Sequence, residues 1–118
     1  AKALPKNSNG LILNLIDQRV LNLKSDFFSY TISKSALYAM TRTLALALAP
    51  RIRVNGIGPG PTLPNSQQTN QVFNLEGKST ILKKVVNPKE IAETMMYLIN
   101  SESVTGQMIA VDSGQHLS

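Results

Sequence analysis

A run of six almost entirely apolar residues, 11–16, places the strongest constraint on the fold of this chain. The run follows Gly10, and a short apolar run that begins at a turn residue is typical of a parallel strand buried on both faces. A second short strand is expected at 51–57, after a long helical segment that ends at Pro50. Strand, helix and strand in this order predict a right-handed crossover, and therefore an α/β fold with a parallel sheet.

The remaining segments extend this pattern. The helical segment at 29–49 is apolar on more than one face, which predicts a helix covered on two sides. Residues 63–79 are polar and predict a long connection, of the kind that often forms a lid over a site. An Asn-Pro pair at 87–88 predicts the start of another helix, and residues 106–111 predict a third strand. We therefore expect one domain of three strands and two main helices.

Composition removes several classes of function. The chain has 118 residues, no cysteine and one histidine, His116, so disulfides, thiolate chemistry and a multi-histidine metal site are excluded, and no metal is expected. His116 is expected to be structural or solvated. The net charge is +5, but the basic residues are scattered and aromatic residues are few, which disfavours nucleic-acid binding. No apolar run approaches the roughly eighteen residues that span a bilayer, so we expect no membrane partner and a cytoplasmic location.

Tyr30 and Lys34 lie four residues apart in the long helical segment, which places both side chains on one helix face. A phenol beside an ammonium is a proton-transfer pair, because the cation favours phenolate and lowers the phenol pKa from about 10. The alternative for such a pair is a packed tyrosine and a solvated lysine. Asp17 follows the first strand, at the end of a parallel sheet where ligands bind. It is either a functional carboxylate or the cap of the loop that follows, and its position alone favours neither.

Four ordered segments strengthen the functional interpretation. They are the strand that ends at Ile16, the pair Tyr30-x-x-x-Lys34, the stretch Arg53-Val-Asn-Gly-Ile-Gly-Pro-Gly60, and Gly106-Gln-x-Ile-x-Val-Asp112 with Gly114. In order and spacing they resemble the second half of a short-chain dehydrogenase/reductase, across almost the whole chain. The resemblance implies the C-terminal half of a Rossmann-like, doubly wound parallel sheet in residues 1–118, with the first half missing.

The resemblance also implies a role for each matching residue. Tyr30 would deliver a proton to the group being reduced, and Lys34 would lower the pKa of Tyr30 and hydrogen-bond the nicotinamide ribose. The turn after the second strand would lie against the cofactor, because Gly60 has no Cβ and lets the backbone approach a ligand closely. The expected catalytic residues are Tyr30, Lys34 and Asp17, and the expected cofactor-binding residues are Tyr30, Lys34, Leu15, Pro59, Gly60 and Thr62.

Asp17 is the most discriminating position. Most of the family has a serine thirteen residues before the tyrosine, whereas an aspartate there resembles the pteridine reductase branch, including dihydromonapterin reductases. A dihydropterin needs a proton at a ring nitrogen as hydride reaches the adjacent carbon, and a carboxyl group beside the phenol can relay that proton. The resemblance therefore implies an NADPH-dependent reductase of a pterin or dihydropterin. The alternatives are a carbonyl reductase similar to 3-oxoacyl-carrier-protein reductases, and an inactive fragment.

The resemblance implies, finally, what this chain needs from outside itself. The family's glycine-rich pyrophosphate turn, the residues that choose between NAD and NADP, and the catalytic asparagine all belong to the missing half. The 118-residue chain alone is therefore expected to be inactive and to bind no NADPH. The strand at 11–16 is expected to meet another chain or to carry exposed apolar surface. Family members are commonly tetramers, which implies a homotetramer joined through the 30–49 helix and the 88–112 helix and strand.

Overall fold

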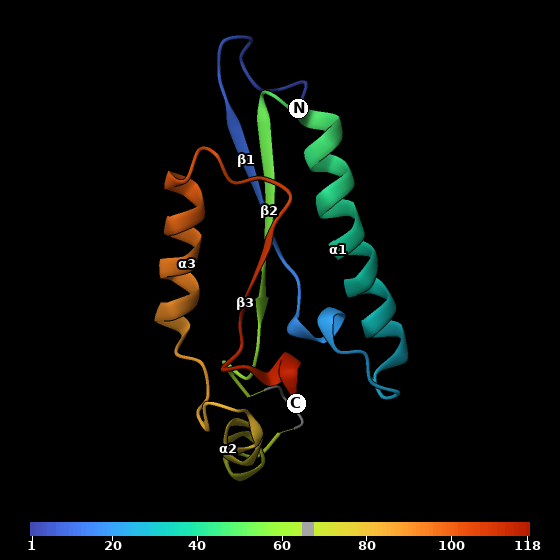
Figure 1. Cartoon of the computed structure of the whole chain (residues 1–118), viewed down its shortest axis with the longest axis vertical. Coiled ribbons are helices and arrows are strands. Elements are labelled where there is room, and N and C mark those ends of the chain that lie inside the picture. Colours follow the sequence, from blue (N-terminus) through green and yellow to red (C-terminus); the bar gives the residue numbers. More distant parts are fainter. Residues whose placement is uncertain (65–67) are drawn as a thin grey trace.

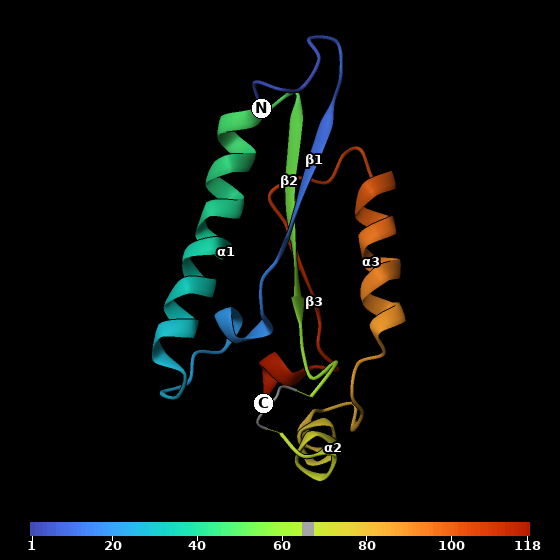
Figure 2. The same cartoon turned by 180° about the vertical axis from the view of Figure 1, so that it is seen from behind.

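The structure, a computed structural model, describes residues 1–64 and 68–118, and its centre is a three-stranded parallel sheet in the order β1-β2-β3. The strands are β1 (Gly10–Leu15), β2 (Ile52–Pro59) and β3 (Met108–Val111). Helix α1 (Phe28–Leu48) covers one face of the sheet and α3 (Pro88–Asn100) covers the other (Figures 1 and 2). The predicted α/β fold with a parallel sheet is confirmed.

Strand β2 is the centre of the sheet because it pairs with both neighbours. Its first six residues pair with β1, from Gly10↔Ile52 to Leu15↔Ile57, and its last four pair with β3. The side chains of Val54 and Ile57 are fully buried. A Cβ atom on Gly56 would lie 2.6 Å from the side chain of Ile16, so the glycine lets the end of β1 pack against β2.

Helix α1 has one packed face and one exposed face. Ala45 packs with Ile52 and Val54 of β2 to form a small core. On other sides of the helix Ile32, Met40 and Leu46 are exposed, and Leu46 is 83% exposed. The predicted apolarity on more than one face is confirmed, although within this chain only one face is covered. The helix begins one residue earlier than expected, after Phe27, which adopts a left-handed conformation with φ 49°.

Strand β1 lies at the edge of the sheet. Within the described residues it pairs with β2 alone, and Ile12 and Leu15 on this strand are exposed. An unpaired strand edge with apolar side chains is a site of association. The predicted exposed apolar surface on the first strand is confirmed.

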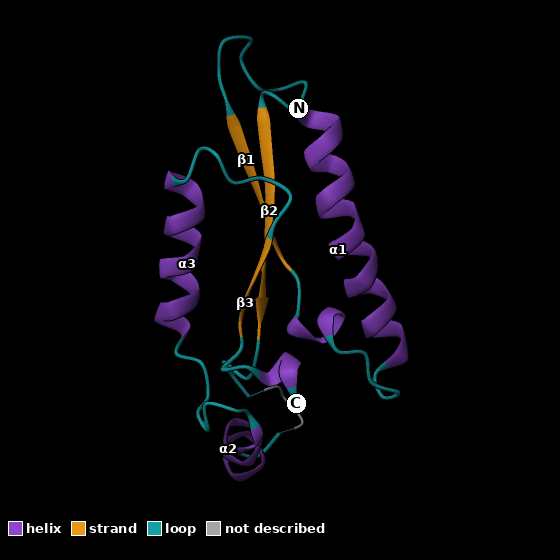
Figure 3. Ribbon diagram, in the orientation of Figure 1, coloured by secondary structure: helices purple, strands orange, loops and turns teal. Residues whose placement is uncertain are grey.

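Helix α2 (Asn70–Ser79) is an α-helix that the sequence interpretation missed, so the expected connection at 63–79 is in part helical and adds a third, shorter helix to the two main ones. The Thr69 hydroxyl accepts a hydrogen bond from the Val72 N–H and caps the helix. The part of the expected connection at 65–67 lies outside the described residues. Helix α2 lies beyond the carboxyl ends of the strands (Figure 3). No helix in the described ranges combines the length and apolarity needed to cross a membrane.

Candidate active site

The predicted site residues gather at the carboxyl ends of the strands, the edge at which open parallel sheets bind ligands. Asp17 follows β1 and caps a short 3-10 helix, η1 (Gln18–Leu21). Tyr30 lies in the first turn of α1, which begins at the same end of the molecule (Figure 1). Pro59 ends β2 at this edge as well.

The two oxygens of Asp17 serve different partners. The Tyr30 hydroxyl donates a hydrogen bond to Oδ2 over 2.7 Å, and the Arg19 backbone N–H donates to Oδ1 over 2.8 Å. The first contact places the carboxylate in the candidate site, and the second makes it the cap of η1. The capping interpretation of Asp17 is confirmed, and its contact with Tyr30 leaves the interpretation as a functional carboxylate a prediction.

The pKa of Tyr30 is raised to about 12, first by burial, then by the hydrogen bond to Asp17 and by the negative charge of Asp17. The positive charge of Arg19 acts in the opposite direction. Lys34 lies with its Nζ 5.8 Å from the centre of the Tyr30 ring and donates instead to the Leu15 carbonyl oxygen, over 3.0 Å. Burial and the Asp17 carboxylate raise the pKa of Tyr30, and Lys34 is not among the groups that shift it, so the lowering by Lys34 stays a prediction.

A cavity of about 430 Å³ opens beside Asp17 and Tyr30 and is lined by several of the predicted site residues. Its lining includes Asp17, Tyr30, Pro59, Gly60, Glu76 and Gln115. Three predicted cofactor residues are not among the lining side chains. The Lys34 ammonium donates a hydrogen bond to the Leu15 carbonyl oxygen. The Thr62 hydroxyl donates to the Gly60 carbonyl oxygen over 3.0 Å. A larger open cavity of about 600 Å³ adjoins Gly10 and Pro50 and contains none of the predicted site residues.

Gly60 lacks a Cβ for a different reason from the one that we expected. An added Cβ would lie 2.6 Å from the Cα of Asp112, and the Gly60 N–H donates to the Val111 carbonyl oxygen over 3.0 Å. The close approach is therefore to the chain's own backbone at the end of β3. The missing Cβ is needed for this packing, and Gly60 also lines the cavity, so its approach to a ligand stays a prediction.

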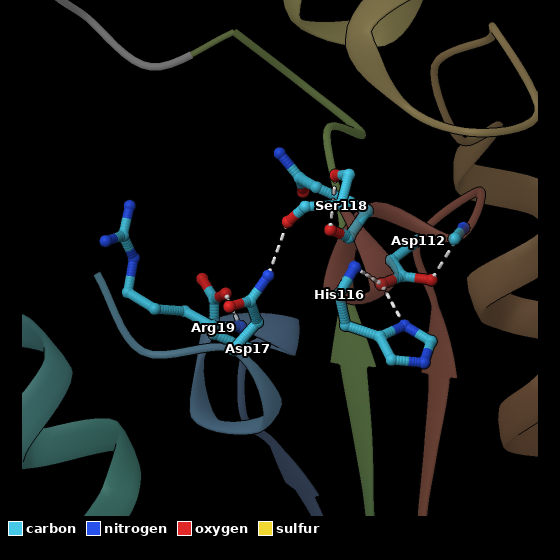
Figure 4. A network of polar contacts seen from close by, with 8 residues as sticks. Asp17, Arg19, Asp112, His116 and Ser118 are labelled. Carbon is cyan, nitrogen blue, oxygen red and sulfur yellow. Dashed lines mark hydrogen bonds and ion pairs between the residues drawn. The ribbon is translucent and has the colours of Figure 1, made fainter.

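A second polar cluster fixes the turn after β3. The buried carboxylate of Asp112 accepts from the backbone N–H groups of Gly114 and His116 and contacts the His116 Nδ1 over 2.6 Å (Figure 4). The expected structural role of His116 is confirmed by these contacts. The side-chain amide of Asn22 donates to the Ser118 carbonyl oxygen over 2.6 Å, which ties this turn to the end of η1.

Sequence reasoning missed several side chains at the site. Arg19 forms an ion pair with Asp26 and lies over the Phe27 ring, 5.2 Å from its centre, and so braces the loop that precedes Tyr30. The hydrogen bond from Arg19 lowers the pKa of Asp26. Glu76 and Gln115 also line the cavity. None of these belongs to the four recognised segments, and only their positions in the fold reveal them.

A parallel α/β sheet with helices on both faces, and with polar side chains gathered at the carboxyl ends of its strands, is the arrangement of a Rossmann-like fold. The family model described as enoyl-(acyl carrier protein) reductase matches residues 1–116. The short-chain dehydrogenase/reductase homolog YusR of Bacillus subtilis is 34% identical over 116 residues, which are 97% of this chain and 89% of that protein. The chain belongs to the short-chain dehydrogenase/reductase family.

Two further relatives carry more specific names. Dihydromonapterin reductase of Citrobacter koseri is 34% identical over 106 residues, covering 90% of this chain and 44% of that protein. The crystal structure of FolM alternative dihydrofolate reductase 1 from Brucella canis, complexed with NADP, is 52% identical, with a TM-score of 0.97, and the match covers 99% of this chain and 47% of that one. The chain therefore spans about half the length of these two relatives.

Proposed function

We propose that this chain supplies the proton-transfer residues of an NADPH-dependent reductase that acts on a pterin or dihydropterin. The observation that carries the proposal is the 2.7 Å hydrogen bond between the Tyr30 hydroxyl and Asp17 Oδ2. A tyrosine paired with a carboxylate can pass a proton to a ring nitrogen, whereas carbonyl reduction needs only a neutral hydroxyl donor. Similarity to dihydromonapterin reductase and to FolM supports the same substrate class.

The residues present fit a nicotinamide cofactor. Lys34 is half-buried, and within the described residues one hydrogen bond, to the Leu15 carbonyl oxygen, uses its ammonium. An ammonium has three donors, so two remain for the ribose hydroxyls of a cofactor beside Tyr30. Pro59, Gly60 and Thr62 would lie on the nicotinamide and diphosphate side. When bound, NADPH supplies the hydride.

The raised pKa of Tyr30 determines how this chain handles the proton. A phenol with a pKa of about 12 releases its proton readily only if another proton replaces it. Tyr30 would give its hydroxyl proton to the substrate nitrogen, and Asp17 would relay a proton from solvent, through the open cavity, to the Tyr30 oxygen. The net change is one proton moved from solvent to the substrate, and Tyr30 and Asp17 both end as they began.

The test compares reduction of dihydrobiopterin or dihydromonapterin with reduction of an acetoacetyl thioester, using NADPH and the protein that carries this chain. Asp17→Ala should lower dihydropterin reduction by roughly 10²-fold or more, because a general acid contributes about 10²–10⁴-fold. Lys6→Ala, in the exposed loop before β1 and outside the cavity and the proposed subunit contacts, is the control and should leave the rate unchanged. Dihydropterin reduction by Asp17→Ala within about twofold of wild type would end the proposal.

The alternatives predict other results in the same experiment. A carbonyl reductase would turn over the thioester and leave the dihydropterins unchanged. An inactive fragment would reduce neither substrate and bind no NADPH.

We also propose that the protein assembles as a homotetramer through the 30–49 helix and the 88–112 helix and strand. Support comes from apolar side chains that this chain alone leaves exposed in both segments, including Leu46 on α1 and Met96 and Tyr97 on α3. Exposed apolar surface of this kind is typical of subunit contacts.

A further inference from the structure

Glu76 places a second carboxylate in the cavity that contains Asp17 and Tyr30. It belongs to the last part of α2, the helix that lies beyond the carboxyl ends of the strands. Its two oxygens accept hydrogen bonds from the side-chain amides of Gln68, over 2.8 Å, and Gln115, over 3.2 Å. Within residues 1–64 and 68–118 no lysine or arginine forms an ion pair with it.

The position of this carboxylate is fixed from the other side of the cavity as well. Gln115 begins the short 3-10 helix η2 (Gln115–Leu117), and its backbone N–H donates to the Asp112 carbonyl oxygen over 3.0 Å. The Asp112 carboxylate holds the same turn through Gly114 and His116 (Figure 4). The Gln115 amide is therefore presented by a rigid turn, and it holds Glu76 at the cavity wall.

The Glu76 carboxylate can accept further hydrogen bonds. A carboxylate has about four lone-pair positions, and the two amide donors occupy two of them. Amide groups are neutral, so the negative charge of Glu76 is left uncompensated. Arg19, which lines the same cavity, already pairs with Asp26. A ligand that brings N–H donors to this wall would meet an acceptor prepared for them.

We propose that Glu76 is a specificity-determining residue that accepts hydrogen bonds from the N–H edge of a 2-amino-4-oxo heterocycle. This inference rests on the proposed pterin substrate. In such a ring the exocyclic amino group and the neighbouring ring N–H point the same way, and two parallel N–H donors match a carboxylate. A 2,4-dioxo ring presents a carbonyl oxygen at the same edge, which a carboxylate repels. Glu76 would therefore select for the amino group and against its oxo replacement.

The test measures binding of two fluorescent bicyclic rings, pterin (2-amino-4-oxopteridine) and lumazine (2,4-dioxopteridine), to the purified protein that carries this chain, with NADP⁺ present. Wild type should bind pterin at least about tenfold more tightly than lumazine, the scale of a charged hydrogen bond. Glu76→Gln should weaken pterin binding about tenfold and strengthen lumazine binding, because an amide can donate to the oxo group. Glu102→Gln makes the same chemical change in the exposed connection between α3 and β3, outside this cavity, and should alter neither affinity.

Three results would overturn the inference. Equal loss of both ligands in Glu76→Gln would make Glu76 a bracing residue of the cavity wall. Unchanged affinities would give it no part in binding, and absence of a preference for pterin in wild type would remove the selection itself. The expected gain in lumazine binding cannot come from an unfolded variant, so loss of stability does not imitate the expected result.

The same measurements keep this inference separate from the proposed function. Dihydropterin reduction with an unchanged ring preference in Glu76→Gln would leave the proposed function standing and refute the role of Glu76. A ring preference that depends on Glu76, without any dihydropterin reduction, would refute the proposed function alone.

Discussion

Replacement of Asp17 by asparagine separates the charge of this residue from its capping role. An asparagine oxygen can still accept the Arg19 N–H, as Oδ1 of Asp17 does, so η1 should remain capped. The position that faces the Tyr30 hydroxyl would change from a charged acceptor to a neutral group. Asp17→Asn therefore removes two of the causes that raise the pKa of Tyr30, the hydrogen bond and the charge, and leaves burial in place.

The size of the effect follows from the pKa of Tyr30, which is about 12 against an ordinary value of 10.0. Two pKa units correspond to about 2.7 kcal/mol for a fully shielded group. Tyr30 is 45% exposed, and solvent screening therefore reduces the contribution of this pKa shift to the free energy of unfolding. We expect a contribution of about 1 kcal/mol. Because burial contributes first, Asp17→Asn should lower the pKa of Tyr30 by about one unit and leave it above its ordinary value.

The direction of the pH dependence is fixed by the raised pKa. Folded Tyr30 holds its proton more tightly than the unfolded chain does, so its stabilising contribution is complete below pH 10. That contribution is lost as the pH rises from 10 to about 12. In Asp17→Asn the loss should be smaller and should finish at a lower pH.

The assay is the ultraviolet absorbance of ionised tyrosine as a function of pH. Subtracting the titration of Tyr30→Phe from that of wild type isolates Tyr30, and the same subtraction in the Asp17→Asn background gives the shifted value. Circular dichroism on the same samples identifies the pH range in which the helices persist. A Tyr30 midpoint at or below pH 10 in folded wild type, or one that Asp17→Asn leaves unmoved, would refute the reasoning.

Two further predictions test the backbone and the assembly. Gly60→Ala should lower the free energy of unfolding by about 1–3 kcal/mol in chemical denaturation, since its Cβ would lie 2.6 Å from the Asp112 Cα. Gly10→Ala, whose Cβ would sit 3.4 Å from a flexible leucine side chain, should cost well under half as much, and equal costs would contradict the packing argument. Leu46→Glu places a charge on the exposed side of α1 and should reduce the mass measured by light scattering from that of a tetramer. An unchanged tetramer would exclude this side of α1 as a subunit contact.

Regular elements with a strong apolar pattern could be predicted from the sequence. The run at 11–16 and the glycine-rich strand that follows Pro50 both form strands of the expected sheet. Only the second is buried within this chain, and the first, expected to be buried on both faces, is an edge strand with exposed apolar side chains. Helix α2 could not be found this way, because Asn, Gln and Gly dilute its apolar residues. Its usable signal is a threonine three residues before Val72, a helix cap that only a close reading of 63–79 detects.

The candidate site shows the same division. The pairing of Asp17 with Tyr30 could be proposed from a motif and its spacing, but the sign of the pKa shift depends on which charge touches the hydroxyl. Spacing along a helix brings Lys34 near Tyr30, yet its ammonium bonds to the Leu15 carbonyl oxygen instead. Glu76 and Gln115 come from segments 39 residues apart, and no local pattern links them. Contacts of this kind require the three-dimensional fold.

The turn after β3 can carry the effect of a distant substitution to the wall of the cavity. The carbonyl oxygen of Ser118 accepts hydrogen bonds from the side chains of Asn22 and Lys24. In the same turn, the Gln115 amide donates to Glu76. Replacement of Asn22, which does not line the cavity, would therefore loosen the turn that holds Glu76 in place.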